Sequence, residues 1–306
     1  MRDTQLSGRD FLAAACIIVI WGTNFVAMKI GLRSFTPFQL GAARYLFGML
    51  PLVLLVRAPR LPWKWVVLYG LCQGVGQFGL LFVSLRVGMT AALASVLMQT
   101  QMFFTALFSF LLLAEKPGKP LLAGMALAAL GLGCFGMTYI TPEAGAEAAT
   151  TVVGFALCLG AASMWAASNI VVRLAQRSAP EFSPLGFLAW CSAVPVLPFV
   201  VASLLFDDPA TRWRWSAAPW EGWLSAAYLG WVATIAAYSM WTNLIKRHGP
   251  NRIAPFSLGV PVIGLASGIV LLGERVTPWQ WGGIVLTVLA LACVVLGGRW
   301  AAARRA

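Results

Sequence analysis

The stretch that decides the fold occurs twice: Trp21–Asn24 reads WGTN in the first long apolar segment, and Trp165–Asn169 reads WAASN in the sixth. Other pairs follow in the same order. Thr36-Pro37 precedes the second apolar segment, and Ser183-Pro184 precedes the seventh. Any single match is weak evidence, but a shared order across both halves of the chain indicates an internal duplication.

Ten apolar segments organise the chain. Of its 306 residues, 60% are hydrophobic and only 10% are charged, whereas a soluble domain carries about 25% charged residues. Each segment is close to the roughly 20 residues that a helix needs to cross a bilayer. We therefore expect an all-α polytopic membrane protein with ten transmembrane helices at residues 11–30, 38–56, 65–86, 90–113, 120–140, 151–172, 185–206, 221–245, 253–272 and 279–298.

The duplication divides these segments into two sets of five. We expect a first repeat over residues 1–145 and a second over residues 146–306. Because five is odd, the second repeat must enter the membrane from the opposite side, so the two repeats have inverted topology. Inverted repeats recur in secondary transporters, which bind their substrates near the membrane midplane.

The net charge of +12 predicts the orientation of the chain. If the amino terminus is cytoplasmic, fifteen of the 22 Lys and Arg residues fall in cytoplasmic segments, six fall on the other side, and Arg44 lies within a span. Cytoplasmic loops of membrane proteins are enriched in Lys and Arg. We therefore expect both termini in the cytoplasm and interpret the basic charge as a topology signal, without a nucleic-acid partner.

A second repeated feature carries a resemblance to a known family. Glu115-Lys116-Pro117 ends the fourth span, Glu274-Arg275-Val276 ends the ninth, and a glycine follows nine residues after each glutamate. This arrangement resembles the EamA family of the drug/metabolite transporter superfamily. Within that family the chain is most similar to bacterial cysteine and O-acetylserine exporters, and more distantly to aromatic amino-acid exporters. The closer similarity is carried by residues 69–78, 88–95, 99–104, 254–258 and 260–262.

The resemblance implies a fold and an activity. The implied fold is a ten-helix bundle around a central cavity, and the implied activity is export of amino acids and related small metabolites across the bacterial inner membrane. Other substrates of the same fold remain open, namely nucleotide sugars or quaternary ammonium drugs, as does a membrane scaffold without transport. Small metabolites and the lipid bilayer are the expected partners, and a monomer is the expected state.

The sequence does not predict an enzyme. It has no GxxxxGK[S/T] phosphate-binding loop, and no Cys–His or Ser–His pairing is plausible across the membrane. We expect no catalytic residue, cofactor or metal. His248, the single histidine, follows Lys246 and Arg247 and is interpreted as a solvated loop residue.

All ten acidic residues lie near span ends or in loops, whereas proton relays place carboxylates inside the bundle. We therefore expect facilitative transport driven by the substrate gradient. Glu115 and Glu274 are expected to hold helix ends and loops. Arg44 lies inside the second span and has two interpretations, snorkelling or structural pairing on one hand, and contact with a substrate carboxylate on the other.

Uncharged polar and aromatic residues at mid-span depth are the candidate binding residues. Amides suit a zwitterion because they donate to a carboxylate and accept from an ammonium. Gln73 and Gln77 are one turn apart and so share a helix face. The alternative for each residue is packing or an interhelical hydrogen bond. The predicted substrate-binding residues are Trp21, Asn24, Gln77, Phe78, Gln99, Trp165, Asn169, Tyr238 and Trp241.

Overall fold

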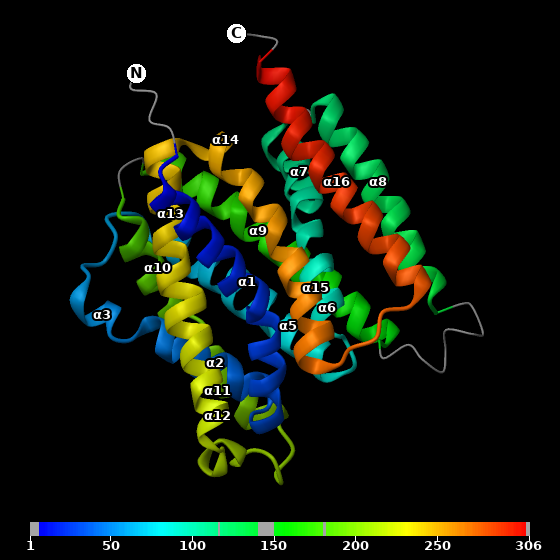
Figure 1. The fold of residues 1–306 in the computed structure, drawn as a ribbon. Helices are drawn as coiled ribbons and strands as arrows, with labels where there is room; N and C mark the ends of the chain where they lie inside the picture. The colour runs from blue at the N-terminus through cyan, green and yellow to red at the C-terminus, as the bar shows by residue number, and fades with distance from the viewer. Residues whose placement is uncertain (1–5, 116, 140–149, 180–181, 304–306) are drawn as a thin grey trace. The chain divides into compact units, whose positions relative to one another are not determined.

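The computed structural model describes residues 6–115, 117–139, 150–179 and 182–303, and this part of the chain is helical without any strand (Figure 1). Its α-helices are α1 (Gly8–Ser34), α2 (Pro37–Met49), α3 (Leu52–Leu55), α4 (Trp63–Tyr69), α5 (Gly79–Arg86), α6 (Ala91–Leu97), α7 (Gln101–Leu113), α8 (Lys119–Met137), α9 (Val152–Ser178), α10 (Pro184–Ala193), α11 (Val196–Phe206), α12 (Trp220–Ala227), α13 (Ala237–His248), α14 (Pro250–Ile253), α15 (Gly259–Leu272) and α16 (Pro278–Ala303). Two π-helices, η1 (Gly70–Phe78) and η4 (Tyr228–Ala236), and three 3₁₀ segments, η2 (Met98–Thr100), η3 (Arg214–Ala217) and η5 (Ala254–Leu258), complete the order.

The helices confirm the predicted all-α membrane fold. Among the described residues, nine helical stretches are long and apolar enough to cross a membrane. They match nine of the ten expected spans. The remaining expected span, 221–245, lies in the continuous run of α12, η4 and α13, but this run is not among the nine. Its Trp, Tyr, Ser and Thr residues make it less apolar than the other spans.

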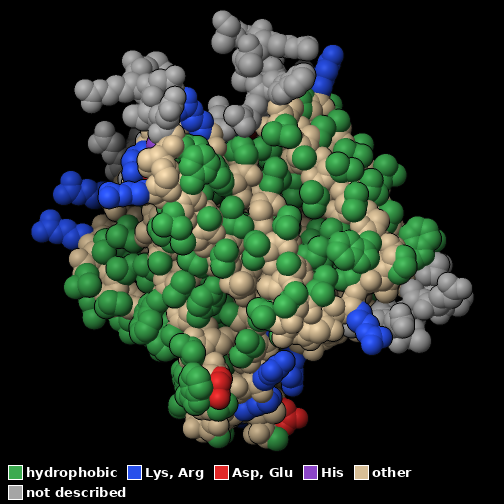
Figure 2. All heavy atoms as spheres, in the orientation of Figure 1, with side chains coloured by type: hydrophobic (Ala, Val, Ile, Leu, Met, Phe, Trp, Pro, Cys, Tyr) green, Lys and Arg blue, Asp and Glu red, His purple; other side chains and the backbone are tan. Residues whose placement is uncertain are grey.

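The surface of these helices is apolar, as a bilayer requires. Leu54 and Val270 are each 78% exposed, and Leu197 and Trp220 are each 69% exposed. On the face drawn in Figure 2, hydrophobic side chains cover most of the helical surface, and Lys and Arg side chains lie near helix ends. Exposed apolar area on this scale would be a liability in water and indicates contact with lipid.

The described chain forms two compact units, and neither corresponds to one sequence repeat. Unit 1 comprises Met1–Phe25, Thr90–Thr150 and Ala237–Ala306, and unit 2 comprises Val26–Met89 and Thr151–Ala236. In unit 1, α8 packs along α16, and α6 packs against α15. In unit 2, α2 packs against α11 and η4, while α9 packs against η1 and α5. Each unit therefore combines segments from both halves of the chain.

Local structure is repeated between the two halves. α1 and α9 each have 27 residues. Thr36 and Ser183 each cap the following helix by accepting a backbone N–H three residues on, and a proline occupies the first helical position in both. Side-chain caps with a proline at the first position are strong helix starts. η1 and η4 are both nine-residue π-helices in the third and eighth predicted spans.

Close approaches at small residues hold each unit together. A Cβ on Gly74 would overlap the ring of Pro195, and one on Gly70 would lie 2.6 Å from Val194 Cβ. In unit 1, a Cβ on Gly264 would overlap the Ser95 side chain. These glycines therefore let helices of the same chain pack closely, which is a common use of small residues in membranes.

Candidate binding residues in the two units

An aromatic group forms in unit 1 between α1 and α13. The ring of Trp21 lies 5.1 Å from that of Tyr238 and 5.4 Å from that of Trp241, in tilted arrangements. All three residues are half-buried. Trp21 and Trp241 pack against a buried apolar cluster that includes Ile17 and Leu244. The structure thus brings together three of the nine predicted residues, with partly exposed rings that could contact a substrate.

The two predicted amides of unit 1 occupy separate helices. Asn24 lies on α1, nearly one turn beyond Trp21, and is 8% exposed. Gln99 lies in the 3₁₀ segment η2 and is 9% exposed. Its Nε2 is 3.5 Å from the carbonyl oxygen of Ser257 in η5, which is at the long limit for a hydrogen bond. Gln99 therefore lies where η2 faces η5.

The predicted residues of unit 2 gather where η1 faces α9. The Ser168 hydroxyl lies 2.5 Å from Gln73 Oε1 and 2.7 Å from the carbonyl oxygen of Trp165. Trp165 and Asn169 are half-buried on α9, where residues three or four positions apart share a face. Gln77 lies one turn beyond Gln73 on η1 and is 4% exposed. Gln73 is not among the nine predicted residues, yet its side chain makes the hydrogen bond that joins η1 to α9.

Phe78 and Arg44 form a buried cation–π pair. The guanidinium carbon of Arg44, on α2, lies 3.7 Å from the centroid of the Phe78 ring. Its Nη2 donates to the Thr234 hydroxyl of η4 at 3.1 Å. Arg44 is 3% exposed, so it does not snorkel to the membrane surface. The guanidinium therefore joins the end of one π-helix to the other, in agreement with structural pairing.

Tyr45 is a member of this group that sequence reasoning missed. Its ring stacks on Phe199 with centroids 6.1 Å apart and meets Phe78 edge-on at 6.1 Å. Its hydroxyl donates to the backbone carbonyl of Gln73 at 3.4 Å. In the sequence, Tyr45 is marked only by its neighbour Arg44, a charged residue within a span. That charge does not predict the ring contacts of Tyr45.

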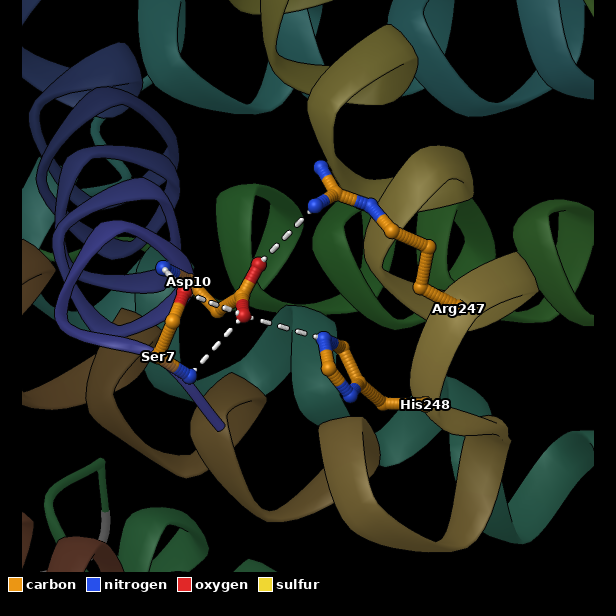
Figure 3. Close-up of polar contacts among 4 residues, drawn as sticks. All are labelled: Ser7, Asp10, Arg247 and His248. Carbon is orange, nitrogen blue, oxygen red and sulfur yellow. Dashed lines mark hydrogen bonds and ion pairs between the residues drawn. The ribbon is translucent and has the colours of Figure 1, made fainter. Parts of the chain in front are cut away.

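The interpretation of His248 as a solvated loop residue is wrong. α13 continues to His248, whose side chain is 4% exposed, and His248 Nε2 lies 3.1 Å from Asp10 Oδ2 (Figure 3). Arg247 Nη1 lies 3.3 Å from Asp10 Oδ1. Asp10 also accepts from the backbone N–H of Ser7 at 3.0 Å and from its hydroxyl at 2.6 Å. These contacts join the start of α1 to the end of α13, the two helices that carry the aromatic group.

Glu274 confirms the prediction that it holds a helix end. Its Oε1 and Oε2 accept from the backbone N–H groups of Ala91 and Ala92, each at 2.7 Å, at the start of α6. A Cβ on Gly268 would lie 2.6 Å from Oε2, so the glycine leaves room for the carboxylate. A negative charge at a helix amino terminus is favourable because the unpaired N–H groups there carry partial positive charge.

The backbone around Glu274 is reproduced at Glu115. The preceding residues, Gly273 and Ala114, are both left-handed, with φ of 66° and 55°. Glu274 N–H donates to the carbonyl of Gly268, and Glu115 N–H donates to that of Ser109. A left-handed residue directly after the last turn is a common way to end a helix. The two glutamates predicted to correspond therefore follow the same helix terminus.

The nine predicted residues form two sets. Trp21, Asn24, Gln99, Tyr238 and Trp241 belong to unit 1, and Gln77, Phe78, Trp165 and Asn169 belong to unit 2. In the part of the chain that is described, no group of three or more His, Cys, Asp or Glu side chains could hold a metal ion. Neutral amides and aromatic rings make up both sets, Tyr238 adds a hydroxyl to the first, and Arg44 is the charged neighbour of the second.

Comparisons with a family model, with related sequences and with solved structures agree with one another. The model of the EamA-like transporter family matches residues 10–137 and again residues 152–296. A protein of Escherichia coli K12 named "Probable amino-acid metabolite efflux pump" is 35% identical over 296 residues, which cover 96% of this chain and 97% of that protein. A protein of the same name from Salmonella typhimurium is 36% identical over 297 residues, with the same coverage. A solved crystal structure with 20% identity covers 95% of this chain and 98% of its own, with a TM-score of 0.61, and shares the fold.

Proposed function

Because the chain belongs to the EamA-like transporter family, and is therefore a multi-pass membrane transport protein, we propose that it exports amino acids and related small metabolites. The membrane is the bacterial inner membrane, with both termini in the cytoplasm. The names of the two efflux-pump relatives, which match this chain over nearly its full length, support the substrate class. Transport is facilitative, of broad specificity, and proceeds by alternating access of a monomer.

The observation that carries this proposal is the chemistry of the buried polar side chains. Gln77 is buried in the membrane-spanning part of unit 2, on η1, which packs against α9 with its half-buried Trp165 and Asn169. Amides and hydroxyls can solvate both ends of a zwitterion, and aromatic rings can contact side chains of many shapes. Such a lining would bind different amino acids weakly enough to release them.

The positions of the acidic residues support facilitative transport. The described ones, Asp10, Glu115, Asp207, Asp208, Glu221 and Glu274, lie within three residues of a helix end or between helices. Asp207 accepts hydrogen bonds from Thr36 and Ser203, and Glu274 caps α6. These carboxylates already have structural partners, whereas a proton-coupling carboxylate must meet the transport pathway.

Two features support alternating access between inverted repeats at residues 1–145 and 146–306. The family model matches once in each half, and each half contains one nine-residue π-helix. π-helical turns are rare and often occur at functional sites. The predicted residues of each unit remain its candidates for substrate contact, and Arg44 with Thr234 would link the two π-helices of unit 2.

Counterflow in liposomes tests the proposal. Purified protein is reconstituted with an excess of one unlabelled amino acid inside, and uptake of labelled cysteine, serine, threonine, methionine or phenylalanine is followed with and without a pH gradient. We expect accumulation of several of them at rates that do not depend on the pH gradient. Acceleration of several-fold by the gradient at constant membrane potential would refute facilitative transport. Absence of flux from folded protein would refute the substrate class.

A further inference from the structure

Gln77 carries a buried polar atom that the fold does not satisfy. Its Oε1 is inaccessible to solvent and has no hydrogen-bond partner within the described ranges. The whole residue is 4% exposed. Buried polar atoms in folded proteins are nearly always paired, because leaving one unpaired is unfavourable. A donor for this oxygen could therefore come from a bound molecule.

The position of Gln77 within its helix favours a role in substrate binding. It lies fifteen residues into the 24-residue helical span Trp63–Arg86 and in the last turn of the π-helix η1. Buried polar atoms of the same kind on Trp65, Thr138 and Arg212, and Nδ1 of His248, lie near helix ends or between helices. Nε of Arg44 also lies within a span, but the guanidinium that carries it donates to Thr234 and faces the Phe78 ring. Gln77 Oε1 is thus an acceptor deep within a span without a described donor, and its desolvation is most unfavourable there.

The neighbouring amide provides an internal comparison. Gln73 lies one turn earlier on the same helix and is 7% exposed, but its Oε1 accepts from the Ser168 hydroxyl at 2.5 Å. Two amides of the same kind on the same helix thus differ in one respect. One bonds across to α9, and the other presents an acceptor oxygen without a described donor.

We propose that Gln77 Oε1 binds the α-ammonium group of the transported amino acid, and that the protein thereby selects substrates with a free amine. This inference rests on the proposed function. An ammonium carries three N–H donors, and a hydrogen bond from a charged donor is stronger than one between neutral groups. A carbonyl oxygen accepts from an ammonium without adding a negative charge, so the substrate is recognised and still released. N-acylated amino acids lack this cation and are poorly bound.

The test compares serine with N-acetylserine as competitors of labelled-serine counterflow in liposomes that contain the full-length protein. The variants are Gln77→Met, which has similar length without an amide, and Gln77→Glu, which keeps an acceptor oxygen. Gln73→Met is the matched control, because it removes the amide that Ser168 already satisfies. Size-exclusion chromatography and thermal unfolding verify that each variant is folded.

We expect the wild-type protein to bind serine at least tenfold more tightly than N-acetylserine. Gln77→Met should lose about tenfold in serine affinity and leave that for N-acetylserine unchanged, without a lower melting temperature. Gln77→Glu should retain the preference for the free amine, and it decides the test if the Met variant does not fold. Gln73→Met should melt earlier and keep the preference.

Three results would overturn the inference. They are a wild-type protein that does not distinguish the two compounds, a Gln77→Met variant with unchanged serine affinity, and equal losses for both compounds. The last would indicate a structural role or a bound water at Oε1. Failure of the wild-type protein to bind any amino acid is a different outcome, because it refutes the proposed function itself.

Discussion

Replacement of Glu274 by glutamine tests whether this carboxylate is a helix cap or a proton-coupling group. The glutamate accepts two backbone N–H bonds of 2.7 Å at the start of α6. Glutamine has one acceptor oxygen, so it can keep one bond and must turn its NH₂ group toward the other N–H. A hydrogen bond to a charged group contributes about 1.5–3 kcal/mol. Because Glu274 is half-buried, the lower part of that range applies.

We therefore expect Glu274→Gln to reduce the free energy of unfolding by about 2 kcal/mol, which corresponds to roughly a thirtyfold change in the folding equilibrium. The 14 tryptophans allow thermal unfolding to be followed by intrinsic fluorescence in detergent. If unfolding is irreversible, midpoints are compared at a single scan rate. Flux in liposomes should respond to a pH gradient as the wild-type protein does.

Glu221→Gln is the matched control for this substitution. Glu221 is also in the first turn of a helix, α12, but it is exposed. The same loss of charge should cost less than about 1 kcal/mol there, because only the interaction with the helix dipole is lost. Equal melting of Glu274→Gln and wild type would refute the cap. A changed pH response of flux, with normal stability, would instead assign Glu274 to proton coupling.

Three further experiments test the binding and packing assignments. Trp165→Ala should reduce transport severalfold at equal membrane abundance, and normal flux would remove this residue from the site. Gly74→Ala places a methyl group against the ring of Pro195 and should destabilise the protein by about 1–3 kcal/mol, as measured by thermal unfolding. Gly133→Ala is the control, because a Cβ there would have open space around it. It should leave the melting temperature unchanged or raise it. In a double-mutant cycle of Arg44→Met and Thr234→Val, we expect a coupling of about 1 kcal/mol, and additive effects would contradict their hydrogen bond.

The parts of the fold that follow from local sequence were predictable. Nine spans were found because long apolar segments in a nearly uncharged chain have few alternatives to membrane helices. The helix starts at Pro37 and Pro184 were marked by the capping residues before them. The π-helices were not predictable, because their residues are as compatible with an α-helix and the change lies only in the hydrogen-bond register.

Side-chain partners that are distant in the chain were the main source of error. His248 stands beside two basic residues, which indicated a solvated loop, but its partner Asp10 lies at the other end of the sequence. Gln73 and Gln77 both lie on η1 and are both buried. Which of them is satisfied depends on Ser168, 95 residues beyond Gln73, and no periodicity in the sequence contains that information.

The duplication explains why the helix boundaries were easier to predict than the candidate binding residues. Both halves keep the capped helix start and the left-handed residue before a glutamate. The polar side chains differ between them. Position eight of η1 is Gln77, whereas position eight of η4 is Ile235, and the residue that corresponds to Arg44 is Cys191. Features present in both copies can be recognised by comparing the copies. The Arg44 guanidinium and the Gln77 amide occur in one copy only, so a comparison of the copies gives no information about them. Their roles are inferred from their contacts in the structure.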